Sequence, residues 1–106
     1  MLNIEDQGIL KLVQKEGAAF MHYLRNGDVL NTLTLSDSGK VAQIKADGTG
    51  KVGFTMKPTE FYDAEVSINP DKEAAKALFD KMLDLNFTHF KTYSEDIVIL
   101  EIKVKK

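Results

Sequence analysis

The chain has 106 residues, a length that favours one domain spanning 1–106, and its formal net charge is -2. Because it contains no cysteine, disulfides, thiolate catalysis and cysteine-based zinc sites are excluded, and nothing indicates an oxidising compartment. The acidic start is unlike a signal peptide, the only basic cluster lies at 103–106, and the longest apolar run is too short to cross a bilayer. We therefore expect a cytoplasmic protein that binds neither nucleic acid nor a membrane.

The first predicted element is a helix that begins at residue 3 or 4 and ends at 16. Asn3 can cap its N-terminus, and the acidic residues of the first turn suit the helix dipole. Gly17 is well placed as the C-terminal stop. The apolar stripe of this helix consists of Ile9, Leu12 and Val13.

A β-hairpin is the next expected element, because the pair Asn26-Gly27 between two strand-like runs favours a two-residue type I′ turn. That turn places Arg25 opposite Asp28 and His22 opposite Asn31. One face, which we expect to be the core, carries Ala18, Phe20, His22, Leu24, Val29, Asn31, Leu33 and Leu35. The other face carries Met21, Tyr23, Leu30, Thr32 and Thr34.

A second hairpin is predicted from strands over 40–46 and 51–56, with turns at 36–39 and 47–50. Its register stays open, because loops of two and of four residues both fit. The run 61–68 alternates apolar and polar residues, which is typical of a half-buried strand.

A second helix is expected after Asn69, the predicted N-cap, with Pro70 at its first position and Asn86 as its stop. Two last strands are predicted over 87–93 and 97–104. Short connections between successive strands favour antiparallel pairing. The fold class is therefore α+β: a mainly antiparallel, barrel-like sheet with an N-terminal helix and a second helix before the last two strands.

The polar pair His22 and Asn31 is the first candidate site, because ligand pockets are mostly apolar with a few polar groups. A hydrogen-bonded core pair is the simpler interpretation. Thr55 and Lys57, at the end of the strand 51–56, are the second candidate. A hydroxyl and an ammonium there could hold a phosphate, although an ordinary strand end with a solvated lysine explains them too.

Other chemistry finds less support in the sequence. The two histidines, His22 and His89, have no partners at metal-ligand spacing, so no metal site is expected. Asp63 and Glu65 could form a carboxylate pair, but a solvated strand face explains them better. Gly48 to Lys51 reads as a hairpin turn and not as a phosphate loop, because no helix is expected to follow it. No catalytic residue is assigned.

In arrangement the chain resembles the flavin-binding split-barrel family, the pyridoxamine 5′-phosphate oxidase-like proteins. The leading segment that ends in Lys15-Glu16-Gly17 before a hairpin is similar to the family's opening. The run Gly50-Lys51-Val52-Gly53-Phe54-Thr55 resembles the strand whose final threonine lies near the flavin phosphate. Asn69-Pro70-Asp71 with its helix, followed by 97–102, resembles the late helix and closing strand.

This resemblance implies an FMN-binding homodimer, with the cofactor near the subunit interface and a possible oxidoreductase activity on an unidentified substrate. Thr55 and Lys57 would hold the phosphate, and His22 and Asn31 would lie near the ring. In the family a short helix with a Ser-x-Lys phosphate contact usually follows the threonine; here Met56 follows it, which leaves Lys57 as the cation.

A second function class stays open from the residues alone. The chain could be a non-catalytic domain that binds a small ligand or another protein. In that case the less apolar hairpin face, with Met21, Tyr23 and Leu30, would be the partner or dimer surface.

Overall fold

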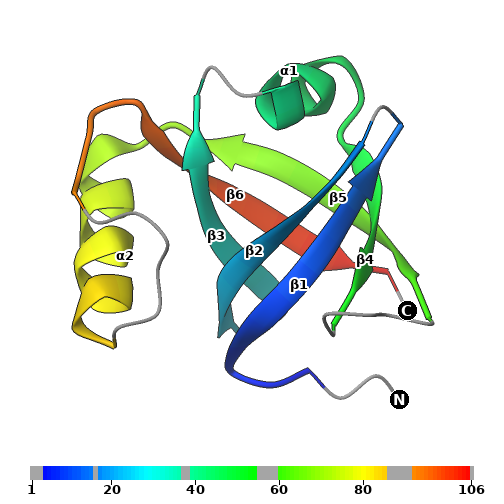
Figure 1. Cartoon of the computed structure of the whole chain (residues 1–106), viewed down its shortest axis with the longest axis horizontal. Coiled ribbons are helices and arrows are strands. Elements are labelled where there is room, and N and C mark those ends of the chain that lie inside the picture. The colour runs from blue at the N-terminus through cyan, green and yellow to red at the C-terminus, as the bar shows by residue number, and fades with distance from the viewer. Residues whose placement is uncertain (1–3, 16, 37–38, 55–59, 86–91, 106) are drawn as a thin grey trace.

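The chain forms a closed barrel of antiparallel strands with two helices outside it (Figure 1). This computed structural model describes residues 4–15, 17–36, 39–54, 60–85 and 92–105. Within them the elements are β1 (Gln7–Gln14), β2 (Gly17–Asn26), β3 (Val29–Leu35), α1 (Gly39–Ala46), β4 (Thr49–Gly53), β5 (Tyr62–Asn69), α2 (Lys72–Asp84) and β6 (Ile97–Val104). The strand order around the barrel is β1-β2-β3-β6-β5-β4. The predicted α+β class with a mainly antiparallel barrel is confirmed.

The predicted N-terminal helix is wrong, because residues 7–14 form β1. Leu10, Leu12 and Gln14 are buried in alternation with more exposed neighbours, which is the period of a strand and not of a helix. β1 also pairs with both β2 and β4, so a helix here would leave the barrel open. Tertiary pairing thus overrides a stripe that fitted a helix equally well.

The register of the first hairpin differs from the prediction by two residues. Asn26 pairs with Val29, so Gly27 and Asp28 occupy the turn, and Leu24 rather than His22 lies opposite Asn31. Gly27 has a φ of 62°, a conformation that favours glycine. The prediction that Arg25 lies opposite Asp28 across the hairpin is therefore wrong.

Arg25 instead anchors the segment that precedes β1. Its Nη2 lies 2.6 Å from Oδ1 of Asp6, and its backbone amide donates a 2.7 Å hydrogen bond to the Asp6 carbonyl. These two contacts join the end of β2 to the residue that precedes β1.

The hairpin face predicted to be the core is the outer face of the barrel. Met21, Tyr23 and Leu30 are between 1% and 3% exposed and belong to the barrel interior. They cannot form a partner surface, and that expectation is wrong. The outer face looked equally apolar because Leu24 and Leu33 pack beneath α2.

The predicted strand over 40–46 is also wrong, because this segment is α1. Among the side chains of α1 that the structure describes, Val41 and Ile44 are buried, and they are three residues apart, which puts them on one face of a helix but on opposite faces of a strand. Ile44 packs into the interior cluster. Figure 1 shows α1 lying across one end of the barrel. The predicted second hairpin therefore does not exist, and β4 starts at Thr49 after a helix.

The later elements follow the prediction closely. β5 alternates as expected, with Ala64 and Val66 buried, and β6 has the predicted bounds. α2 is confirmed, but its N-cap is Asp71, whose Oδ1 accepts from the amides of Glu73 and Ala74. Asn69 instead accepts a 3.0 Å hydrogen bond from the Asp71 amide, which moves the cap by two residues.

α2 ends at Asp84, with Leu85 as its C-cap. Asn86, the predicted stop, and most of the predicted strand 87–93, including His89, lie outside the described residues. Thr92 and Tyr93 are described and are not in a strand.

Two apolar clusters hold these elements together. The barrel interior contains Leu10, Leu12, Met21, Tyr23, Leu30, Ile44, Val52, Ala64, Val66, Leu100 and Ile102. The layer between the barrel wall and α2 contains Leu24, Leu33, Ala75, Phe79, Met82, Ile97 and Ile99. β6 therefore buries both of its faces, which explains its nearly continuous apolar sequence.

One buried hydroxyl in the barrel has no hydrogen-bond partner in the described part of the chain. Thr32 is 1% exposed, and its Oγ1 has no hydrogen-bond partner among the residues described. A buried unsatisfied group costs about 1–3 kcal/mol, so Thr32→Val should raise the free energy of unfolding by about 1 kcal/mol. Urea unfolding measures this change. Thr34→Val is the control, since Thr34 is similarly buried but has a partner, and it should destabilise; equal effects of the two changes would contradict the prediction.

The buried phenol of Tyr23 makes stability depend on alkaline pH. Its hydroxyl donates a 3.3 Å hydrogen bond to the Glu5 carbonyl. Burial, followed by the charge of Glu5, raises the pKa of Tyr23 above its ordinary value of 10.0. The folded protein therefore holds this proton more tightly than the unfolded chain does. This contribution to stability is complete below the unfolded pKa and is lost as the pH rises through the folded pKa.

Urea unfolding at a series of alkaline pH values tests this expectation. The fall in the free energy of unfolding should be smaller in Tyr23→Phe than in the wild type. Tyr93→Phe should keep the wild-type fall, because Tyr23 is unchanged in it. The same pH dependence in the wild type and in Tyr23→Phe would show that this phenol is not responsible.

Candidate functional site: the outer barrel wall and a groove beside α1

Two of the four residues predicted to contact a flavin lie in the described part of the chain. Thr55 and Lys57 lie outside the described residues. His22 and Asn31 are both half-buried on the outer face of the barrel, on β2 and β3. Asn31 pairs with Leu24, so the structure does not place His22 directly opposite it. The two side chains share a face but are offset along it.

The outer face of β1 and β2 offers an aromatic surface beside a cation. Lys11 lies opposite Phe20, and its Nζ is 5.5 Å from the centre of the Phe20 ring. Phe20 is nevertheless 45% exposed. Ile9 lies opposite His22 on the same face. A flat ligand needs an exposed apolar surface with a few polar groups at its edge. Phe20 and Ile9 supply apolar surface here, and Lys11 and His22 supply polar groups.

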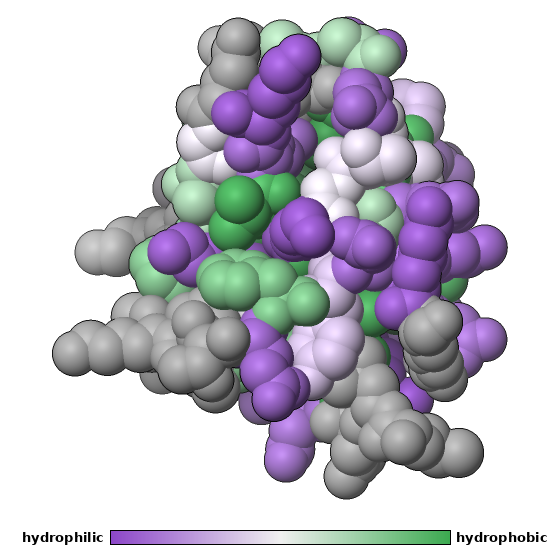
Figure 2. Space-filling view, turned by 90° about the vertical axis from the view of Figure 1, so that its right-hand side faces the viewer, coloured by the Kyte–Doolittle hydropathy of each residue, from purple (hydrophilic) through white to green (hydrophobic). Residues whose placement is uncertain are grey.

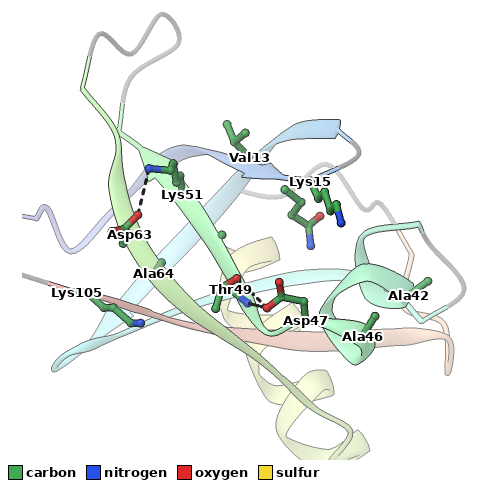
Figure 3. Close-up of a pocket in the computed structure, with 12 residues that line it drawn as sticks. Val13, Lys15, Ala42, Ala46, Asp47, Thr49, Lys51, Asp63, Ala64 and Lys105 are labelled. Atoms are coloured by element: carbon green, nitrogen blue, oxygen red, sulfur yellow. Dashed lines mark hydrogen bonds and ion pairs between the residues drawn. The ribbon is translucent and has the colours of Figure 1, made fainter.

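A separate groove opens between α1 and the strands nearest to it (Figure 3). Its volume is about 1090 Å³. The lining comes from the end of β1, from α1, from the start of β4, from β5 and from the end of the chain. The residues are Val13, Gln14, Lys15, Ala42, Ala46, Asp47, Thr49, Gly50, Lys51, Asp63, Ala64 and Lys105.

Pairing between strands explains how three distant lysines reach one groove. Lys51 on β4 lies opposite Val13 on β1, which brings it close to Lys15. The amide of Lys105 donates a 2.7 Å hydrogen bond to the carbonyl of Asp63 and so holds the chain end against β5. Figure 3 shows Lys15, Lys51 and Lys105 around Thr49 and Asp47.

Carboxylates balance part of this positive charge. Lys51 Nζ lies 3.2 Å from Oδ1 of Asp63, and Lys105 Nζ lies 3.7 Å from Oε1 of Glu65. Oδ1 of Asp47 accepts hydrogen bonds from the amide and the hydroxyl of Thr49, at 3.2 and 2.8 Å. The exposed ion pairs contribute little to stability, so the lysines can exchange partners at low cost.

The carboxylates considered from the sequence belong to this charged wall. Asp63 and Glu65 are exposed on the outer face of β5, and each has a lysine partner. Figure 2, which looks onto the side of the barrel with β4 and β5, shows hydrophilic residues surrounding smaller hydrophobic patches. A solvated face is therefore the better interpretation of this pair, as the sequence indicated.

Sequence reasoning did not single out Lys15 or Lys105 for this groove. They are ninety positions apart by their numbers, and only the closure of the barrel brings them together. No local spacing in the sequence could have joined them. Among the residues that the structure covers, no three His, Asp or Glu side chains converge as a metal site would require, and no helix has the length and apolarity of a membrane span.

Comparisons with known proteins identify the fold. No protein family matches the sequence, and no curated protein matches it. Among solved structures, a predicted pyridoxamine 5′-phosphate oxidase of Listeria innocua has a TM-score of 0.70 at 17% identity, covering 96% of this chain and 86% of that one. An FAD-binding protein of Mesorhizobium loti has a TM-score of 0.64 at 13% identity, covering 96% and 83%. An F420 reductase has a TM-score of 0.60 at 16% identity, covering 94% and 86%.

The chain therefore has the split-barrel fold of the pyridoxamine 5′-phosphate oxidase-like proteins. The resemblance implied by the sequence is confirmed at the level of the fold, which is what likenesses at these identities show. The activity and the ligand of this chain do not follow from the fold alone.

The position of α1 indicates a different location for the Ser-x-Lys motif of that resemblance. The family's short helix with a Ser-x-Lys contact has no counterpart after Thr55 in the sequence, but α1 is a short helix that directly follows β3. The sequence leading into it reads Ser38-Gly39-Lys40 after Thr34. Ser38 and the side chain of Lys40 lie outside the described part of the structure. The spacing was present in the sequence, but the predicted strand over 40–46 hid it.

Proposed function

We propose that this chain is a flavin-binding protein with FMN as its cofactor and an oxidoreductase activity on an unidentified substrate. The observation that supports this proposal is the split-barrel fold, which it shares over almost its whole length with an FAD-binding protein and an F420 reductase. A bound flavin supplies two-electron redox chemistry, while the protein supplies binding, orientation and electrostatics.

The outer wall of the barrel is the proposed seat of the flavin ring. His22 and Asn31 supply polar groups there, and Phe20 with Lys11 supplies an exposed aromatic surface and a cation. The ammonium of Lys11 also suits a ligand that carries negative charge. These residues hold and orient the ring in this proposal; none of them is given a chemical step.

Two placements of the flavin phosphate compete. The first uses Thr55 and Lys57, as the sequence resemblance implies. The second uses Ser38 and Lys40 at the start of α1, and the short helix after β3 favours it. A lysine acts on phosphate as a point charge in either placement, so removing the right one should weaken binding markedly.

The visible absorption spectrum tests the proposal. We expect the purified protein, mixed with FMN and then desalted, to retain the flavin absorption bands. Lys40→Ala should reduce the retained flavin if the second placement holds, and Lys57→Ala if the first does. Lys81→Ala on the exposed face of α2 is the matched control. A wild-type protein that stays colourless with FMN would refute flavin binding.

A homodimer is part of the same proposal. Light scattering over a wide range of concentrations checks it, and a strictly monomeric protein would contradict it. If both flavin and dimer are absent, the non-catalytic alternative remains, but with a different surface. Met21, Tyr23 and Leu30 are buried, so the exposed Phe20 and Phe61 would be the first residues to test.

A further inference from the structure

The groove beside α1 is lined by described residues that include neither of the proposed flavin contacts His22 and Asn31. Its volume of about 1090 Å³ is sufficient for a small organic ligand. A cavity of this size on a small barrel therefore needs an explanation of its own.

One wall of the groove is built from small residues. Ala42 and Ala46 are four positions apart, so their methyl groups lie on the same face of α1. Gly50 on β4 also lines the groove, and a Cβ atom there would lie only 3.1 Å from both Leu12 Cδ1 and the Val13 carbonyl, so a larger residue would press on the barrel wall. These three residues add no bulky side chain to the groove.

The rim of the groove carries more ammonium groups than carboxylates. Three ammonium groups and two carboxylates line the groove, and one of the carboxylates, Asp47, already accepts two hydrogen bonds from Thr49. The side chains of Lys51 and Lys105 are 62% and 53% exposed, so each ammonium can turn from its carboxylate toward a ligand. Gln14, only 9% exposed, is a further polar group in the lining.

From this combination we infer that the groove binds a small organic anion, a flat apolar body that carries a phosphate, sulfonate or carboxylate. The body lies against Ala42, Ala46 and Gly50, and the anionic group lies among Lys15, Lys51 and Lys105. Charge-assisted hydrogen bonds to the ammonium groups fix the orientation of the ligand. This site does not depend on whether the barrel binds a flavin.

The test uses anilinonaphthalene sulfonate, a flat aromatic anion, titrated into the full chain and followed by amide chemical shifts. We expect saturable one-to-one binding, with shifts concentrated at residues 13–15 and 49–51. Phenylnaphthylamine, the same ring system without the sulfonate, should bind more weakly. Inorganic phosphate should compete with the sulfonate, since both need the lysine rim.

Matched variants separate the groove from general attraction to a charged surface. Lys15→Gln should weaken binding by about threefold to tenfold, while Lys81→Gln on α2 leaves it unchanged. Ala42→Leu keeps every charge but fills the apolar wall, and it should also weaken binding. Both groove variants should retain added FMN as the wild type does, so the two proposals fail separately. Shifts that map elsewhere, equal effects of Lys15→Gln and Lys81→Gln, or no saturation would overturn the inference.

Discussion

Leu100→Ala should lower the free energy of unfolding by about 2–5 kcal/mol, because it removes a large side chain from the middle of the barrel. Leu100 is 0% exposed and lies between Thr32 on β3 and Ile68 on β5. Three strands therefore meet around it, and they cannot all move inward to refill the space. A domain of this size is typically stable by about 5–15 kcal/mol, so the loss would be a large part of the total.

Urea unfolding at neutral pH measures this loss as a lower midpoint at an unchanged slope. Leu35→Ala is the matched control, because Leu35 also lies in a strand but is 39% exposed. We expect the control to change stability by about 0.5 kcal/mol or less. A midpoint for Leu100→Ala that equals that of the control would show that the barrel interior is not packed as described.

Phe79→Ala should cost about 3–5 kcal/mol by emptying the layer between α2 and the barrel wall. Phe79 is 3% exposed and packs with Leu33 and Ile99. Its ring centre lies 5.8 Å from that of Tyr93 in an edge-to-face contact, which adds to the loss. No other aromatic ring of α2 is available to take its place, since Phe79 is the only one in that helix.

Hydrogen exchange distinguishes this effect from general destabilisation. In Phe79→Ala the amides of α2 should lose more protection than those of β1 and β2, because the helix loses its main anchor while the barrel interior stays filled. Leu83→Ala in the same helix is the control, with Leu83 47% exposed. Uniform loss of protection over helix and barrel would contradict the separation of the two apolar clusters.

Most of the correct predictions rested on the periodicity of apolar residues and on helix-capping residues. Within the predicted run 61–68, residues 62–68 alternate with a period of two, and the apolar stripe of α2 has a clear helical period, so both elements were found within one or two residues at most ends. The barrel followed from the number of short antiparallel strands. The sequence could not decide between Asn69 and Asp71 as the N-cap, because both side chains can accept hydrogen bonds from backbone amides. In the structure Asn69 accepts from the Asp71 amide and Asp71 accepts from the Glu73 amide, so Asp71 is the N-cap.

Two elements were mistaken because short segments fit both periods. In β1 the residues Ile9, Leu12 and Val13 fit a helix, while Leu10 and Leu12 fit a strand, and only pairing with β2 and β4 decides. In α1 the burial of Ile44 against the barrel interior fixes a helix that the sequence alone did not favour. Because the segment 40–46 was predicted to be a strand, the Ser38-Gly39-Lys40 spacing before a short helix was not recognised. The groove could not be predicted from the sequence, because its lysines come from distant parts of the chain and line one groove only when the barrel is closed.

The place of β6 in the barrel has a consequence for biosynthesis. β6 pairs with β3 on one side and β5 on the other, yet it is translated after both of them. While the ribosome is still making the chain, those two strands present unpaired edges, which are the usual templates for aggregation. The hairpin of β1 and β2 can form early, but the barrel stays open until β6 has emerged. Closure of the barrel during translation therefore waits for β6.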